Sequence, residues 1–187
     1  MDRPAPRRVE LIRHTGTARH GVVRRIDVEI AWTPDGALQL RYFVDGDVSR
    51  IAIPPPAASF PADGLWRHTC FEAFIAGEAS TAYCEFNFSP STQWAVYGFT
   101  SYREGMAQLE HTIPPQLATS ITDDRIALEA IVPRETLLAL PGEKMLRLGL
   151  AAVCSTCATM VSVLLVAGIF HFAPLSERPD SLAGMME

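Results

Sequence analysis

The chain has 187 residues, 48% of them hydrophobic, and its 16 basic and 21 acidic side chains give a formal net charge of −5. This length and apolar content suit one domain with a substantial core, so folding requires neither a metal ion nor a disulfide. Nucleic-acid binding needs a clustered excess of Lys and Arg, and the acidic balance therefore argues against nucleic acid as the main partner.

The two ends of the chain differ from its middle. Seven arginines fall in the first 25 positions, and a solvated N-terminal arm over residues 1–20 is preferred to an anion-binding patch. The start of the chain contains no apolar stretch typical of a secretory signal. Four cysteines without such a signal indicate reduced thiols in a cytoplasmic protein. Residues 175–187 are expected to form a loose tail, and residues 1–187 a single domain.

Short alternating segments predict β-strands in the first third of the chain. Residues 25–30 and 38–44 alternate in this way on either side of the turn Thr33-Pro34-Asp35-Gly36, which predicts a β-hairpin. A further short strand is expected over residues 48–53. Three prolines, Pro54 to Pro56, would end it, because proline cannot donate a hydrogen bond to a strand ladder.

The same pattern continues through the rest of the chain. In residues 83–88 the alternation predicts that Cys84, Phe86 and Phe88 face the core and that Tyr83, Glu85 and Asn87 face the other way. Other strands are expected over residues 69–75, 93–100, 126–132 and 146–150, with a turn of helix over 133–140. Because no long helix is predicted, the fold class is all-β.

One uncharged run allows a different interpretation. No charged residue occurs from Leu148 to Phe170, a length that would suffice for a transmembrane helix. However, serine, threonine and glycine dilute the run, and it continues the alternating strand over residues 146–150. Buried strands are therefore preferred to a membrane span.

The central part of the chain carries a specific resemblance. The segments Gly64 to Phe74 and Tyr83 to Ala95, followed by Tyr102 and Arg103, resemble a DOMON-like domain of the bacterial single-domain kind. The resemblance extends over residues 20–153. It implies an antiparallel β-sandwich of roughly nine to eleven strands. This fold is shared with family 9 carbohydrate-binding modules and with haem-binding cytochrome domains.

The resemblance to the sugar-binding relatives also implies a site. A tryptophan six positions before a glutamate is matched by Trp66 and Glu72, and polar residues two apart on the next strand are matched by Glu85 and Asn87. Glu85 stands where those relatives have an arginine. A tryptophan face packs on a sugar ring, while carboxylate and amide groups bond its hydroxyls. The predicted ligand is thus a carbohydrate or sugar-containing metabolite, bound without catalysis. The site residues are Trp66, Arg67, His68, Glu72, Glu85, Asn87 and Arg103.

Two other functions stay open, because no second tryptophan occurs late in the chain to close a sugar site. One is a haem-binding electron-transfer domain, since haem-binding relatives hold iron with methionine and histidine. The candidate ligands are His68, Met106, Met160 and His171, none of them in a recognised ligand motif. The other is a protein-interaction module without a small ligand. No cofactor is predicted for the preferred function.

Two residue pairs could carry chemistry but have simpler interpretations. Cys154 and Cys157 form a C-x-x-C pair in an apolar strand context without a basic neighbour, so two inert thiols are preferred to a redox or zinc pair. Glu72 and Glu85 could form the carboxylate pair of a glycosidase. Sugar-hydroxyl acceptors are the preferred interpretation, and the chain is not expected to be an enzyme.

Overall fold

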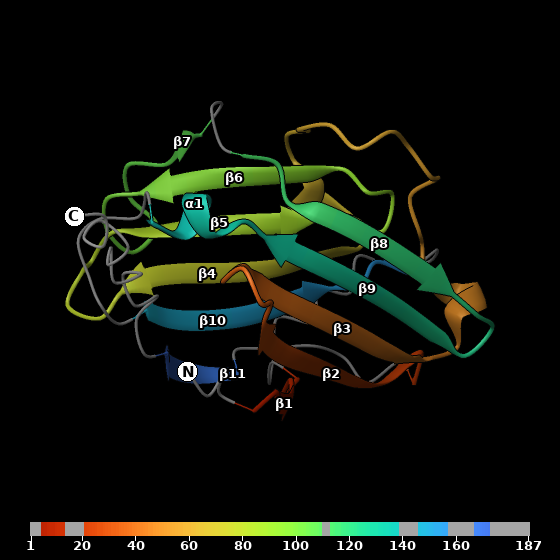
Figure 1. Ribbon diagram of the computed structural model, residues 1–187. Helices are drawn as coiled ribbons and strands as arrows, with labels where there is room; N and C mark the ends of the chain where they lie inside the picture. Colours follow the sequence, from red (N-terminus) through yellow and green to blue (C-terminus); the bar gives the residue numbers. More distant parts are fainter. Residues whose placement is uncertain (1–4, 14–20, 110–112, 139–145, 157–166, 173–187) are drawn as a thin grey trace, which may run out of the picture.

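The computed structural model describes residues 5–13, 21–109, 113–138, 146–156 and 167–172, which form two antiparallel sheets packed as a β-sandwich (Figure 1). The predicted fold class is confirmed. In order across the five-stranded sheet lie β1 (Arg7–Glu10), β2 (Val23–Trp32), β3 (Leu38–Gly46), β9 (Arg125–Val132) and β8 (Gln116–Ile121). In order across the six-stranded sheet lie β11 (Ala167–Phe172), β10 (Leu146–Val153), β4 (Cys70–Gly77), β5 (Tyr83–Phe88), β6 (Trp94–Phe99) and β7 (Ala107–Gln108). The short helices are η1 (Val48–Arg50), η2 (Leu65–Arg67) and α1 (Arg134–Leu138).

The core fills the space between the two sheets and follows from alternation along the strands. In β5, Cys84, Phe86 and Phe88 are buried in this core, as predicted. Since successive side chains of a strand point to opposite faces, Glu85 and Asn87 lie on the outer face of the six-stranded sheet. The sequence pattern therefore determines which residues are available to a site on that face.

A buried hydroxyl group connects the two sheets across the core. Tyr42 of β3 packs its ring on Phe71 of β4, with the ring centroids 5.0 Å apart. Its hydroxyl donates a hydrogen bond to the backbone carbonyl of Glu72 at 2.8 Å. This contact holds β4, the strand that carries Glu72, against the opposite sheet.

Tyr42→Phe is expected to lower the free energy of unfolding by about 1–2 kcal/mol, because the ring stays in place while a buried hydrogen bond is lost. Urea unfolding followed by tryptophan fluorescence would measure the change. Tyr102→Phe is the matched control, since Tyr102 is 78% exposed and its loss should change stability by less than about 0.5 kcal/mol. Equal effects of the two substitutions would contradict the role of the Tyr42 hydroxyl.

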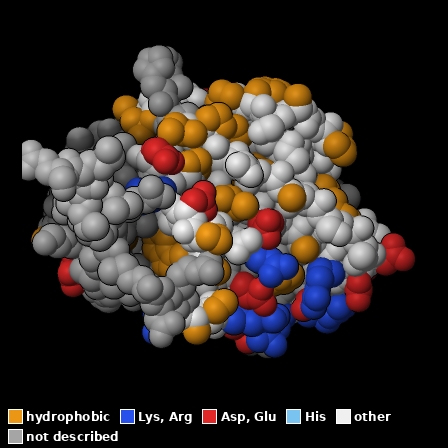
Figure 2. All heavy atoms as spheres, viewed as in Figure 1, with side chains coloured by type: hydrophobic (Ala, Val, Ile, Leu, Met, Phe, Trp, Pro, Cys, Tyr) orange, Lys and Arg blue, Asp and Glu red, His pale blue; other side chains and the backbone are white. Residues whose placement is uncertain are grey.

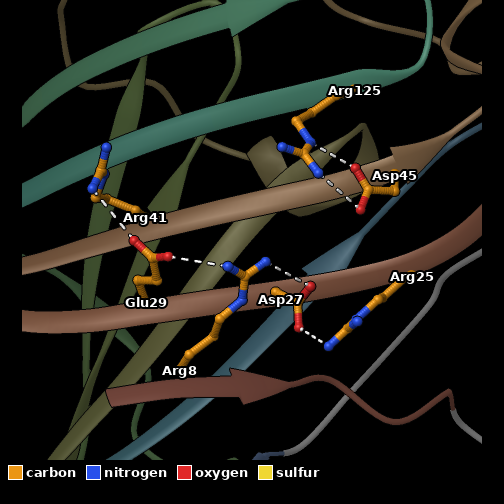
Figure 3. Close-up of polar contacts among 7 residues, drawn as sticks. All are labelled: Arg8, Arg25, Asp27, Glu29, Arg41, Asp45 and Arg125. Carbon is orange, nitrogen blue, oxygen red and sulfur yellow. Dashed lines mark hydrogen bonds and ion pairs between the residues drawn. The ribbon is translucent and has the colours of Figure 1, made fainter. Parts of the chain in front are cut away.

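A network of ion pairs covers the outer face of the five-stranded sheet, and Figure 2 shows its charges gathered over β2 and β3. Asp27, only 1% exposed, pairs with Arg8 at 3.1 Å and with Arg25 at 2.8 Å (Figure 3). The other pairs are Glu29 with Arg8 and Arg41, Arg41 with Glu129, Arg25 with Glu10, and Asp45 with Arg125. Each carboxylate of this network therefore pairs with an arginine on a neighbouring strand or on the same strand.

The network explains a difference from the sequence prediction at the N-terminus. Residues Arg7–Glu10 fall within the expected flexible arm, yet they form β1, which pairs with β2. Arg8 on β1 contacts Asp27 and Glu29 of β2. These carboxylates are distant in sequence, so local composition alone indicated a solvated segment where the sheet has an edge strand.

The strand predicted over residues 48–53 is wrong. Val48–Arg50 form η1, in which the Ile51 backbone N–H bonds the Val48 carbonyl at 3.0 Å. The Ser49 hydroxyl bonds the Asp47 carboxylate at 2.6 Å, a local contact that favours a turn over a ladder. Ile51 keeps a single bridge, to Thr156.

Most of the described part of the uncharged run from Leu148 to Phe170 lies on strands. It includes most of β10 and the start of β11, which pair antiparallel, while residues 157–166 lie outside the described part. None of the helices among the described residues is long and apolar enough to cross a membrane. Cys154, the residue after β10, is fully buried, and burial raises the pKa of its thiol to about 12. Its partner in the C-x-x-C pair, Cys157, lies outside the described residues.

Candidate functional site

Three polar side chains meet on the outer face of the six-stranded sheet. Glu72 of β4 lies directly opposite Asn87 of β5, and Glu85 lies two residues before Asn87 on the same side of its strand. The Asn87 amide donates a hydrogen bond to Glu85 Oε1 at 2.9 Å and accepts one from the Cys70 thiol at 3.5 Å. The structure thus brings together three of the predicted site residues, Glu72, Glu85 and Asn87.

Burial shifts the protonation of both carboxyl groups. Glu72 is only 5% exposed, and this burial, with a smaller contribution from the charge of Glu85, raises its pKa to about 7. Burial also raises the pKa of Glu85, although the hydrogen bond from Asn87 partly offsets the increase. In the described part of the chain, no side chain donates a hydrogen bond or forms an ion pair with the Glu72 carboxylate. Near neutral pH this group can accept a hydrogen bond when charged or donate one when protonated.

An aromatic wall adjoins these carboxylates. Gly64, with a φ of 73° that favours glycine, immediately precedes η2, which carries Trp66. The Trp66 ring meets Tyr97 of β6 edge to face, with centroids 5.4 Å apart, and Tyr97 lies directly opposite Glu85 in the ladder. The Tyr97 hydroxyl donates to Asp63 at 2.6 Å. Trp66, partly exposed, is therefore held next to the polar residues rather than in the main core.

Three of the predicted site residues, Arg67, His68 and Arg103, are exposed, and among the described contacts none of them touches Glu72, Glu85 or Asn87. The Arg67 guanidinium lies 5.9 Å from the Trp66 ring centroid, and His68 follows η2. Arg103 lies in the loop after β6 with a left-handed φ of 61°, and its guanidinium is 5.3 Å from the Tyr102 ring centroid. The structure places Arg67 and His68 near Trp66 and places Arg103 elsewhere.

Arg103 belongs to a second aromatic group on the same sheet. Tyr83 of β5 stacks on Phe99 of β6, with centroids 4.5 Å apart and the planes 5° from parallel. The Tyr83 hydroxyl accepts a hydrogen bond from the Arg103 backbone N–H at 3.3 Å. Since Tyr83 lies two residues before Glu85 on the same side of β5, this group continues the outer face away from Trp66.

Sequence reasoning missed two residues that support the site. Tyr97 and Asp63 position Trp66, but neither is among the site residues predicted from the sequence. Alternation along 94–99 does place Tyr97 on the same side as Ala95 and Phe99, opposite to the core residue Trp94. That signal could have identified Tyr97, whereas the Asp63 contact depends on how the loop before η2 folds over the sheet.

The haem and metal hypotheses gain no support from the described residues. Of the candidate haem ligands, His68 and Met106 are exposed, while Met160 and the side chain of His171 lie outside the described part. Among residues 5–13, 21–109, 113–138, 146–156 and 167–172, no three His, Cys, Asp or Glu side chains are grouped as metal ligands.

The fold also occurs in a protein of known structure. A candidate carbohydrate-binding protein from Bacteroides uniformis aligns with a TM-score of 0.57 and 13% identity, over 94% of this chain and 80% of that chain. At this identity the likeness shows a shared β-sandwich fold. A family 9 carbohydrate-binding module from Caldicellulosiruptor kristjanssonii aligns with a TM-score of 0.46 in two structures. The one with cellotriose shows 13% identity over 87% of this chain and 71% of that chain. The one with glucose shows 12% identity over 94% and 88%.

Comparison by sequence finds no relatives of this kind. No protein-family model matches the chain, and no curated protein matches it significantly.

Proposed function

We propose that this protein binds a carbohydrate or sugar-containing metabolite, without catalysis, on the outer face of its six-stranded sheet. The observation that carries the proposal is the buried Glu72 carboxylate, which has no hydrogen-bond partner among the described residues. It lies beside Asn87 and Glu85 and on the same face as Trp66. A buried polar group without a partner costs free energy, and a ligand that bonds it recovers that cost.

The chemistry of this face suits a sugar ring. A pyranose presents hydroxyl groups around its edge and C–H groups on its faces, so it needs hydrogen-bond acceptors beside an aromatic surface. Glu72 and Glu85 supply the oxygens, Asn87 orients Glu85 through its amide hydrogen bond, and Trp66 supplies the aromatic surface. The resemblance of the sequence to DOMON-like domains, and the shared fold with a candidate carbohydrate-binding protein, support the same ligand class.

Trp66→Ala is expected to weaken sugar binding by at least about tenfold, since aromatic side chains commonly contribute about 2 kcal/mol at the centre of a binding site. Thermal-shift screening against monosaccharides, oligosaccharides and nucleotide sugars would find the ligand, and isothermal titration calorimetry would compare the variants. Phe43→Ala is the matched control, because Phe43 is a partly exposed aromatic residue on the outer face of the other sheet. Unchanged binding in Trp66→Ala would refute the proposed site. An absorbance band at about 400 nm in the purified protein would instead indicate haem.

A further inference from the structure

We propose that the ligand of this site is a sugar that carries a protonated amine, held by Glu72 and Glu85 with Trp66 against its ring. This inference rests on the proposed function and makes it more specific. It follows from the charge of the site and from a comparison of Glu72 with Asp27, another buried carboxylate among the described residues.

Arginines on the outer face of the six-stranded sheet are engaged away from the two carboxylates. Arg147 of β10 donates to the backbone carbonyls of Gly77 and Ser80. Arg67 lies over the Trp66 ring, and Arg103 lies over the Tyr102 ring. Among the residues that the structure describes, no ion pair reaches Glu72 or Glu85. The site therefore carries acidic groups whose charge is not compensated within the described part of the chain.

The other sheet provides an internal comparison. Asp27 is also almost completely buried on an outer face, but it pairs with both Arg8 and Arg25 (Figure 3). Glu72 is buried to a similar extent and has no such partner in the described chain. A buried carboxylate is stable in its charged form only when a cation or several donors accompany it. For Glu72 this missing cation is best supplied by the ligand.

An ammonium group fits the available contacts better than a neutral hydroxyl. It brings a full positive charge and three hydrogen-bond donors, whereas a hydroxyl brings one donor and leaves the carboxylate charge uncompensated. Asn87 donates its amide to Oε1 of Glu85 only. The second oxygen of Glu85 and the oxygens of Glu72 therefore remain for further donors. Trp66 and Tyr97 form an aromatic wall beside them, and an aromatic face attracts a cation as well as the C–H groups of a sugar. Glu85 is partly exposed and offers the first contact for an approaching amine.

Titration calorimetry with glucosamine, glucose and N-acetylglucosamine at low salt tests the inference. Glucosamine is expected to bind at least about tenfold more tightly than glucose, because it adds an ion pair with a buried carboxylate. N-acetylglucosamine, in which the amine is uncharged, should not share this gain. The preference for glucosamine should decrease with added salt.

Variants then assign the preference to Glu72. Glu72→Gln keeps the size of the side chain and removes its charge, so the preference for glucosamine should fall to within about twofold. Glu129→Gln, on the outer face of the other sheet, should keep the full preference. Circular dichroism and melting temperature would confirm that both variants are folded.

The binding experiments distinguish a failure of the amine inference from a failure of the proposed sugar site. Equal binding of glucosamine and glucose by the unmodified protein would overturn the amine and leave the sugar site standing. Equal binding of glucosamine and cyclohexylamine, a ring amine without hydroxyls, would overturn the sugar as the ligand. Binding of none of these sugars, with no response from the wider sugar panel, would overturn the inference and the proposed function together.

Discussion

Glu72→Gln is expected to raise the free energy of unfolding by about 3 kcal/mol at about pH 8 and to leave it nearly unchanged at about pH 4. The cause is the burial of the Glu72 carboxyl, which raises its pKa from 4.5 to about 7 in the folded protein. Ionising the group therefore costs more in the folded than in the unfolded chain. Glutamine has the same shape and never ionises, so the variant avoids this cost.

The direction of the pH dependence follows from proton uptake. Between pH 4.5 and about 7 the folded protein keeps a proton on Glu72 that the unfolded chain has released. Stability must then fall as the pH rises through this window, and the full loss is reached above it. Urea unfolding of the wild type and of Glu72→Gln at a series of pH values would show two curves that diverge over this range.

Other groups near Glu72 do not reverse this direction. Burial also raises the pKa of Glu85, so its effect on stability has the same sign. Burial raises the pKa values of Cys70 and Tyr42 well above their ordinary values, and it raises that of Tyr97, so these three groups stay neutral in the window. The difference between the wild type and Glu72→Gln therefore isolates the Glu72 carboxyl.

Asp27→Asn provides the opposite control. Asp27 is as deeply buried as Glu72, but its charge is matched by Arg8 and Arg25. Removing one member of a buried ion pair leaves the other uncompensated, so this variant should lose stability where Glu72→Gln gains it. A loss of stability in both variants at about pH 8 would show that Glu72 has a stabilising partner, and it would contradict the charge argument for the ligand.

The opposite stability changes expected for Glu72→Gln and Asp27→Asn connect the stability of the fold with the proposed function. A carboxyl group whose burial reduces the stability of the free protein must obtain its compensation elsewhere, and such perturbed groups cluster at binding and catalytic sites. A cationic ligand would supply that compensation and would stabilise the folded state in proportion to its concentration. Glu72 therefore joins the stability of the fold to the occupancy of the proposed site.

Alternation in the sequence predicted the strands that have one buried face. Strands β2, β3, β5 and β9 show clear apolar alternation, and the structure confirms them. Edge strands were missed, because they lack that pattern. Gln116–Ile121 forms β8 although most of its side chains are exposed, and Arg7–Glu10 forms β1 through partners on β2. An edge strand is determined by the strand beside it rather than by its own composition.

The residues of the candidate site also differ in whether strand alternation could place them. Glu85 and Asn87 could be placed on one face from the alternation of β5, and the antiparallel neighbour then brought Glu72 to them. The position of Trp66 could not be derived in this way. It depends on the contact with Tyr97 and on the hydrogen bond of Tyr97 to Asp63, which join a loop to a strand distant in sequence.

The largest loss of stability is expected from Phe86→Ala, by about 3–5 kcal/mol, because Phe86 is fully buried between the sheets and its removal leaves a cavity. Urea unfolding at constant pH would measure it. Glu85→Ala, one residue earlier on the outer face, removes no core side chain and should cost less, about 1–2 kcal/mol, because the buried Asn87 amide loses its acceptor. The two variants together test the alternation along β5.

Comparing Phe86→Ala with Glu85→Ala also tests the register of β5, on which the candidate site depends. A shift of β5 by one residue would exchange its faces, placing Glu85 in the core and Phe86 outside. The costs of the two substitutions would then be reversed, and Glu72 would no longer have Asn87 opposite it. A large loss for Phe86→Ala with a smaller one for Glu85→Ala therefore supports the register that brings the acidic residues together. Because core residues and outer-face residues alternate along the same strand, the packing of Phe86 determines where Glu85 and Asn87 lie in the proposed site.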